Sequence, residues 1–349
     1  MRKDFSCFRD GAVTTLAVAE PGSSADRLDR SLQAATACVY RVALASRKDL
    51  LLTVTWTRRS VVTTSVADAA AAGAAGLSVA VEEVQAGAST KPTLPPSSAA
   101  GTPAATPRRS AVKPAATASP QQRVMHLMQK RRGTRSFVTE GGTAVAVHWD
   151  TSEAKYAAAS PEPCGGEYHL AVVADAELAL LLGRGAAREE LSRRFGAASS
   201  PALVSRREQL RAPPAEAAVA HSTRCRFRDG GAEHEVTVRC RGDRRGTSDE
   251  RADGEVAVSV DGKSIVEARR VGWNFRGNRT AVLGDGAVVE VMWDVHDWWF
   301  AGGVGAAQFM VKARGPGPAD GGRVWMDEEL ASQGQPPDGF FLHMQCYRR

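Results

Sequence analysis

The chain has 349 residues, a length that allows one large domain or two modest ones. Its composition, 43% hydrophobic but only 6% aromatic with 33 glycines and 17 prolines, predicts that part of it stays unfolded. The net charge of +6 allows an anionic partner without requiring one. No stretch approaches the roughly 18 apolar residues of a membrane span, and no secretory signal opens the chain, so we expect a cytoplasmic or nuclear protein.

The cysteines and histidines exclude the common metal and cofactor sites. Six cysteines are scattered without the paired spacing of zinc ligands, which favours reduced, structural thiols. The seven histidines show no pairing four residues apart, and the chain has no phosphate-binding or nucleophile-elbow motif. We therefore expect no metal and no cofactor, and no catalytic residue is assigned.

In chain order, an N-terminal segment (1–35), expected to be partly disordered, precedes two β units. The first unit (36–211) contains a stretch rich in Pro, Ala and Thr (87–122) that cannot bury enough apolar surface to fold. Thr106, Ser110 and Ser119 in this insertion are candidate phosphorylation sites. The second unit occupies 222–349.

The division into two units follows from a repeat. RGTRSFVTEGGTAVAVHWD (132–150) aligns without a gap with RGNRTAVLGDGAVVEVMWD (276–294), and nine of the 19 positions are identical. Because the RGxR and the glycine turn align together with the valines, duplication explains the match better than chance.

Most segments of both units alternate apolar and polar residues with the period of a half-buried strand. Turns are predicted at Gly141-Gly142, Asp261-Gly262 and Asp285-Gly286. Amphipathic segments at 186–195 and 323–332 predict one short helix per unit, each followed by a last strand. The sum is an all-β protein of roughly a dozen strands, two internally duplicated antiparallel units that are sandwich-like or barrel-like.

Several of these segments together resemble the plant "domain of unknown function 868" family. They include WNFRGN (273–278), VEVMWDVHDWWF (289–300) and AQFMVKAR (307–314). The resemblance spans nearly the whole chain apart from the insertion. It implies a plant protein with an all-β fold, and it brings no substrate or catalytic residue.

The two WD strands are the first candidate site. Alternation places Trp149 and Trp293 on the apolar face, so we expect both in the core. Asp150 and Asp294 fall on the opposite face at the strand ends. They either bind the backbone of the following turn, which we favour, or divide acid and base duties as carboxylates do in glycosidases.

The segment after the second WD is the next candidate, because the first unit has no counterpart to it. Asp294, His296, Asp297, Trp298 and Trp299 form an aromatic and polar cluster that suits a stacked ligand. In an extended strand, His296 and Asp297 would point to opposite faces and could not form a catalytic dyad. We favour a structural role, with one tryptophan packed and the other partly exposed.

The third candidate is a pair of basic loops around the RGxR motifs. If both loops reach one edge, they form a patch for phosphates of lipid headgroups, nucleic acid or a phosphoprotein. The alternative is two solvated turns whose arginines bind nearby carboxylates. The residues are Lys130, Arg131, Arg132 and Arg135 in the first loop, and Arg269, Arg270, Arg276 and Arg279 in the second.

The sequence therefore favours a non-enzymatic binding or adaptor module that uses the basic loops for an anionic partner. A carbohydrate-active or hydrolytic enzyme built around Asp294 and His296 is one alternative. A carrier of a hydrophobic molecule in a β-barrel or sandwich cavity is another.

Overall fold

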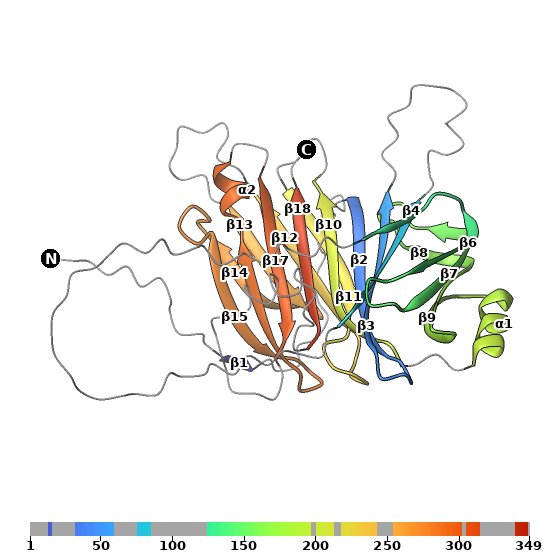
Figure 1. The fold of residues 1–349 in the computed structure, drawn as a ribbon. Helices are drawn as coiled ribbons and strands as arrows, with labels where there is room; N and C mark the ends of the chain where they lie inside the picture. The colour runs from blue at the N-terminus through green and yellow to red at the C-terminus, as the bar shows by residue number, and fades with distance from the viewer. Residues whose placement is uncertain are drawn as a thin grey trace, which may run out of the picture.

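One ten-stranded sheet runs through the protein in the computed structural model (Figure 1), which describes residues 13–15, 32–58, 75–84, 124–196, 200–212, 218–242, 254–301, 305–314 and 339–347. Its strands, in spatial order, are β1 (Val13–Thr15), β15 (Arg276–Val282), β16 (Val288–Asp294), β17 (Ala306–Ala313), β18 (Phe341–Tyr347), β10 (Ala202–Arg211), β2 (Leu32–Ala43), β3 (Asp49–Arg58), β4 (Ala75–Glu83) and β5 (His126–Met128). Neighbouring strands are antiparallel, apart from the parallel pairs β1–β15 and β10–β18. Within the described residues the sheet ends at β1 and β5, so the barrel-like alternative is wrong and the sandwich is confirmed.

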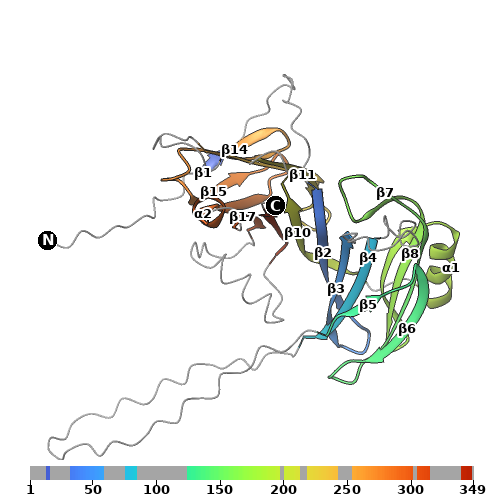
Figure 2. The same cartoon turned by 90° about the horizontal axis from the view of Figure 1, so that it is seen from above.

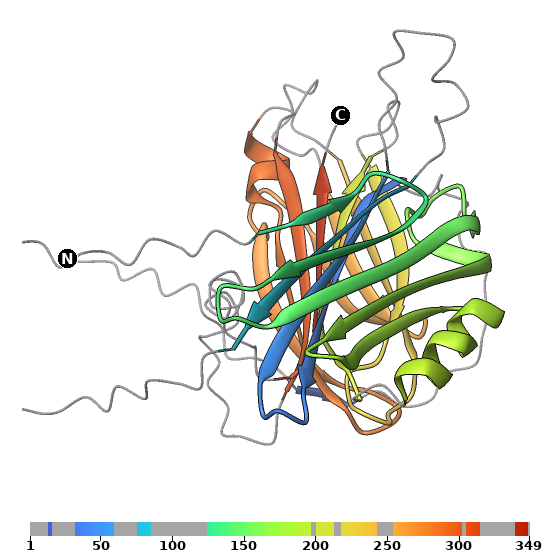
Figure 3. The same ribbon diagram turned by 45° about the vertical axis from the view of Figure 1, so that its right-hand side comes forward.

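Two four-stranded sheets form the second layer. One contains β6 (Arg132–Val138), β7 (Ala144–Tyr156), β8 (Pro163–Ala174) and β9 (Glu177–Arg184); the other contains β11 (Ala218–Cys225), β12 (His234–Arg241), β13 (Glu255–Val260) and β14 (Lys263–Arg269). Figure 3 shows the first of them crossing in front of β2 and β3. Each small sheet covers one half of the large sheet and closes a separate hydrophobic core.

Both small sheets lie on the same face of the large one. Arg206 of β10 stands opposite Cys38 of β2 and Leu342 of β18, and residues directly opposite in a sheet point to one face. Leu342 belongs to the core under β11–β14, whereas Val54, opposite Cys38 on β3, belongs to the core under β6–β9. Figure 2 shows the two small sheets side by side on this face, with β10 between them.

The predicted turns form where the sequence places them. Asp261 and Gly262 both have positive φ, 51° and 75°, as a two-residue hairpin of type I′ requires. Gly142 and Gly286 also have positive φ, 86° and 81°, in the turns that connect β6 to β7 and β15 to β16. The left-handed backbone at these positions explains why glycine or an Asp-Gly pair stands there.

The two repeated hairpins share the same internal register. Arg132 stands opposite Asp150 in β6–β7, and Arg276 stands opposite Asp294 in β15–β16. The hairpins nevertheless belong to different layers, since β6–β7 lies in a small sheet and β15–β16 in the large one. The matching register supports the internal duplication, which stays a prediction.

Two short helices are present in the described residues. α1 (Ala186–Phe195) forms where its pattern predicts and lays Leu191 and Phe195 on the outer side of β8 and β9, over an apolar cluster that includes Val173. The helix predicted over 323–332 and the insertion 87–122 lie outside the described residues. No helix in the described part of the chain is long and apolar enough to cross a membrane.

Candidate anion-binding surface

The two WD tryptophans are buried, and each holds a turn in place. Trp149 and Trp293 are both 7% exposed and pack in the two cores, as predicted. The indole Nε1 of Trp149 donates to the carbonyl of Lys130 at 2.9 Å, and that of Trp293 donates to the carbonyl of Asn274 at 3.1 Å. A large aromatic side chain can pack and still use its polar edge in this way. The WD strands thereby fix the position of the basic loops.

The glycine of each RGxR motif makes room for the same tryptophan. A Cβ atom on Gly133 would lie 2.9 Å from Cζ2 of Trp149, and a Cβ on Gly277 would clash with the ring of Trp293. Each glycine stands directly opposite its tryptophan across the hairpin. Close approach of the indole ring therefore requires glycine at these positions.

The two aspartates bind the backbone that follows them. Oδ1 of Asp150 accepts from the amide of Ser152 at 2.8 Å, and Oδ1 of Asp294 accepts from the amide of His296 at 2.9 Å. Burial works against the charge of Asp150, but hydrogen bonds from Ser152 and nearby positive charges outweigh it and lower the pKa of Asp150. The local role that we favoured from the sequence is thus the observed one.

The segment after Asp294 is a short helix, α2 (His296–Phe300), so the argument that extended backbone keeps His296 and Asp297 apart does not apply, and the two side chains do meet. The backbone leaves the strand because the amide of His296 is held by Asp294, and Trp299 then donates its amide to the carbonyl of Val295 at 2.9 Å. Trp298 and Trp299 are 0% and 6% exposed, so neither offers a face to a ligand. The expectation of one partly exposed tryptophan is wrong.

The polar residues of this cluster are occupied by one another. Nδ1 of His296 lies 3.0 Å from Oδ1 of Asp297, and the ring of His296 contacts Phe275 and Phe300. Oδ2 of Asp294 pairs with Nε of Arg276 at 2.7 Å. Asp294 contacts His296 only through the backbone amide of His296, and the two side chains bind other partners. The enzyme alternative gains no support from this geometry.

The first basic loop joins β5, the edge strand of the large sheet, to β6, the edge strand of the first small sheet. Lys130, Arg131, Arg132 and Arg135 are all exposed, and no carboxylate of the described residues forms an ion pair with any of them. Nη1 of Arg135 donates to the carbonyl of Leu127 at 3.4 Å, which places this arginine beside β5. Within the described residues, no ion pair neutralises these four charges.

The second basic loop joins β14 to β15 and is tightly bonded. The carbonyl of Arg270 accepts from the amides of Trp273 and Asn274 at 2.9 and 3.1 Å, and the side-chain amide of Asn274 donates to the carbonyl of Arg269 at 2.8 Å. Arg270 has a positive φ of 55° within this turn. The turn presents Trp273, which is 88% exposed, between exposed arginines.

The strand directions place both loops at the same end of the large sheet. β5 leads into the first loop at Met128, which pairs with Leu77, and Leu77 pairs with Trp56 near the end of β3. From β3 the pairings run through β2, β10, β18, β17 and β16 to β15, and they bring the start of β15, at Arg276, to the same end. This is the upper end in Figure 1, where α2 also lies.

The loops occupy opposite edges at that end. β15 and β5 are eight strand positions apart in the large sheet, roughly 40 Å along it at the usual spacing. Figures 1 and 2 both place β15 and β6 on opposite sides of the molecule. The condition for a single patch, that both loops reach one edge, is not met, and two separate basic loops share one end instead.

The sequence reading missed two features. One is the exposure of Trp273, which the sequence already indicates because this aromatic residue falls in the turn between two predicted strands. The other is a buried polar network on β10, where Glu208 accepts from Thr223 at 2.7 Å and from Arg206 at 2.5 Å. Alternation from Leu210 places Arg206 and Glu208 on the inward face, and that signal was available.

The network joins all three sheets. Arg206 also pairs with Glu162 of the β7–β8 connection, and Nε2 of His221 on β11 lies 2.6 Å from Glu208. Burial opposes ionisation of Glu208, but the hydrogen bond with His221 and the charge of Arg206 outweigh it and lower the pKa of Glu208 to about 2. Burial raises the pKa of the neighbouring Cys38 to about 12, so this thiol stays protonated and is a poor nucleophile. These features indicate a structural role.

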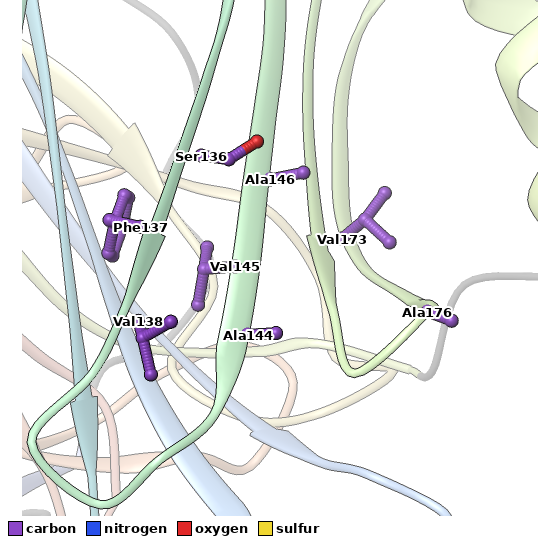
Figure 4. A pocket seen from close by; sticks show the side chains of 8 residues that line it. All are labelled: Ser136, Phe137, Val138, Ala144, Val145, Ala146, Val173 and Ala176. Carbon is purple, nitrogen blue, oxygen red and sulfur yellow. The ribbon is translucent and has the colours of Figure 1, made fainter.

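A shallow apolar hollow lies on the outer face of the first small sheet (Figure 4). Small side chains, Ala144, Ala146 and Ala176, form much of its lining, and Ser136 supplies the one polar side chain there. The lining contains no titratable group, so acid–base chemistry has no residue to use in it.

The family described as plant protein of unknown function (DUF868) matches residues 31–338. No curated protein and no solved structure matches the chain.

Proposed function

The chain belongs to the DUF868 family of plant proteins of unknown function, and on that premise we propose that it is a non-enzymatic binding module for an anionic partner. The membership confirms the family resemblance found in the sequence. The proposed contact is made by the basic loops that join β5 to β6 and β14 to β15.

A single observation supports this proposal: two loops with exposed arginines lie at one end of a continuous sheet. Each loop is tied to a core by an indole hydrogen bond, from Trp149 in one case and Trp293 in the other. A preorganised loop loses less conformational entropy on binding, so more of the interaction energy of its charges contributes to affinity. The two loops are equipped to contact one extended anionic partner at two points.

The arginines of the two loops are not equivalent. Arg276 already pairs with Asp294, whereas Arg131 and Arg132 form no ion pair among the described residues, although the charge of Arg132 helps to lower the pKa of Asp150. An exposed ion pair contributes little to stability, but it does neutralise charge locally. We therefore assign the larger share of anion binding to Arg131, Arg132, Arg269 and Arg270.

The proposal is tested with heparin, a polyanion, as the probe. We define a basic-loop variant, in which Arg131, Arg132, Arg269 and Arg270 are each changed to Gln. The control variant carries the same change at four exposed arginines elsewhere, Arg193 and Arg194 on α1, Arg224 on β11 and Arg239 on β12. Because binding through counterion release weakens with salt, the basic-loop variant is expected to elute from heparin at lower salt than the control. Equal elution of the two variants would refute the proposed function.

A further inference from the structure

The side chains beside both basic loops are apolar and exposed. Leu127, in the strand that leads into the first loop, is 52% exposed, and Val124 and Met125, just before that strand, are 59% and 54% exposed. Trp273 of the second loop is 88% exposed, more than any other large apolar side chain in the described residues. Scattered apolar residues are common on protein surfaces, but here they accompany both groups of arginines.

Contacts between β5 and β6 keep these groups adjacent. Arg135 reaches the carbonyl of Leu127, and the ring of His126 stacks on Phe137 with centroids 3.7 Å apart. β5 therefore runs beside β6, the first strand of the small sheet, and the backbone of Leu127 contacts Arg135. Exposed apolar side chains and positive charges therefore lie near one another along the edge formed by β5 and β6.

We infer that the anionic partner is the surface of a phospholipid bilayer, an inference that rests on the proposed function. Anionic headgroups attract Lys and Arg, and apolar side chains gain free energy by entering the boundary between headgroups and acyl chains. Tryptophan is favoured at that boundary because its ring is apolar and its N–H is polar. The combination at both loops fits a bilayer in charge and in polarity.

The placement of the loops supports the same partner. Two loops at one end of the sheet, roughly 40 Å apart along it, offer two points of contact to one extended surface. A nucleic acid offers phosphates but leaves Val124, Met125 and Leu127 without an apolar environment. Stacking on bases uses aromatic rings, and the first loop presents aliphatic side chains instead.

The test uses vesicles of phosphatidylcholine alone and of phosphatidylcholine with phosphatidylserine, with the full chain. We define an anchor variant, Leu127→Ser with Trp273→Ser, which keeps every charge. Both residues are exposed, so the fold is expected to survive, and circular dichroism checks this. The wild type is expected to sediment with the phosphatidylserine vesicles and to remain in solution with phosphatidylcholine alone.

Each variant then has its own expected result. At about fivefold per basic residue near the surface, the basic-loop variant should bind anionic vesicles several hundred-fold more weakly, and the control variant should bind as the wild type does. The anchor variant should bind vesicles several-fold more weakly while its elution from heparin stays unchanged.

Two outcomes would overturn the inference, and they differ from failure of the proposed function. A wild type that elutes from heparin later than the basic-loop variant but ignores anionic vesicles would keep the proposed function and exclude the membrane. An anchor variant with unchanged vesicle binding would show that Leu127 and Trp273 do not contribute to membrane binding. If the wild type then bound duplex DNA more tightly than vesicles, the loops would be assigned to nucleic acid.

Discussion

Trp293 and Asn274 are joined by a hydrogen bond of 3.1 Å from the indole Nε1 to the backbone carbonyl, and this bond ties the exposed second loop to the buried core. Trp293→Phe removes the donor and keeps most of the packing. We expect the free energy of unfolding to fall by about 1–3 kcal/mol. Hydrogen exchange at the amide of Asn274, which donates to Arg270, should also become faster.

The control for this change is Val291→Ala. Val291 is fully buried on the same strand, and it stands opposite Arg279, away from the tip of the loop. Val291→Ala should lower the free energy of unfolding by a comparable amount, on the order of 2 kcal/mol, without changing hydrogen exchange at the amide of Asn274. Equal exchange in the two variants would show that the indole bond does not position the loop.

Gly277→Ala tests the close approach of the indole ring. A Cβ at this position clashes with Trp293, so we expect a loss of about 1–3 kcal/mol in unfolding free energy, measured by urea denaturation. Gly284→Ala is the matched control, since a Cβ there meets no atom within 4 Å. If the two substitutions cost the same, steric contact with Trp293 is not the reason for glycine in the motif.

The strands were predictable because their signal is local. Alternation at 51–58 and 256–262 predicts β3 and β13, and the turns at Asp261-Gly262 and Asp285-Gly286 are set by backbone conformation alone. The pairing between distant strands has no such local signal. Nothing in the sequence of β10 specifies that it pairs in parallel with β18, and this pairing makes the large sheet continuous.

The candidate sites were harder to predict, because they too depend on contacts that have no local sequence signal. In the segment at 295–300, the run of aromatic residues fits a strand as well as a buried helix, and the bond from His296 to Asp294 decides for a helix. The basic loops were identified by sequence. Their common end and their opposite edges depend on strand order, which only the fold supplies.

Glu208→Gln tests the network that joins the three sheets. The change leaves Arg206 with a partly uncompensated charge, and we expect a loss of about 3–5 kcal/mol in unfolding free energy at neutral pH. Because the pKa of Glu208 is lowered from 4.5 to about 2, its contribution is complete above pH 4.5 and is lost as the pH falls towards 2. The difference between wild type and variant should shrink over that interval.

The control for this prediction is Glu190→Gln on α1. Glu190 pairs with Arg193 on the exposed face of the helix, with side-chain exposures of 63% and 73%. Such a pair contributes little, so the variant should unfold as the wild type does at every pH. A Glu208→Gln protein with wild-type stability would contradict the structural role of the network.

His234 predicts a pH dependence of the opposite sign. Nδ1 lies 2.7 Å from Asp261 and Nε2 lies 3.3 Å from Asp285. Burial disfavours the charged ring, but the two carboxylates outweigh it and raise the pKa of His234 above 6.5. The protonated ring therefore stabilises the fold fully below pH 6.5, and this stabilisation is lost as the pH rises through the folded pKa.

Asp261→Asn should flatten that dependence, because it removes the nearer carboxylate. The measurement is the melting temperature from pH 5 to 9, together with the NMR titration of His234. A wild-type protein whose stability does not fall above pH 6.5 would contradict this assignment.

The most direct measurement of the membrane contact is the quenching of Trp273 fluorescence by brominated lipids. The emission of Trp273 is obtained as the difference between the wild type and Trp273→Phe, which leaves the buried tryptophans in both proteins. With anionic vesicles that carry bromine near the headgroup end of the acyl chain, we expect this difference emission to be strongly quenched, since Trp273 would lie at the boundary. Unquenched difference emission from vesicle-bound protein would contradict a loop that enters the bilayer surface.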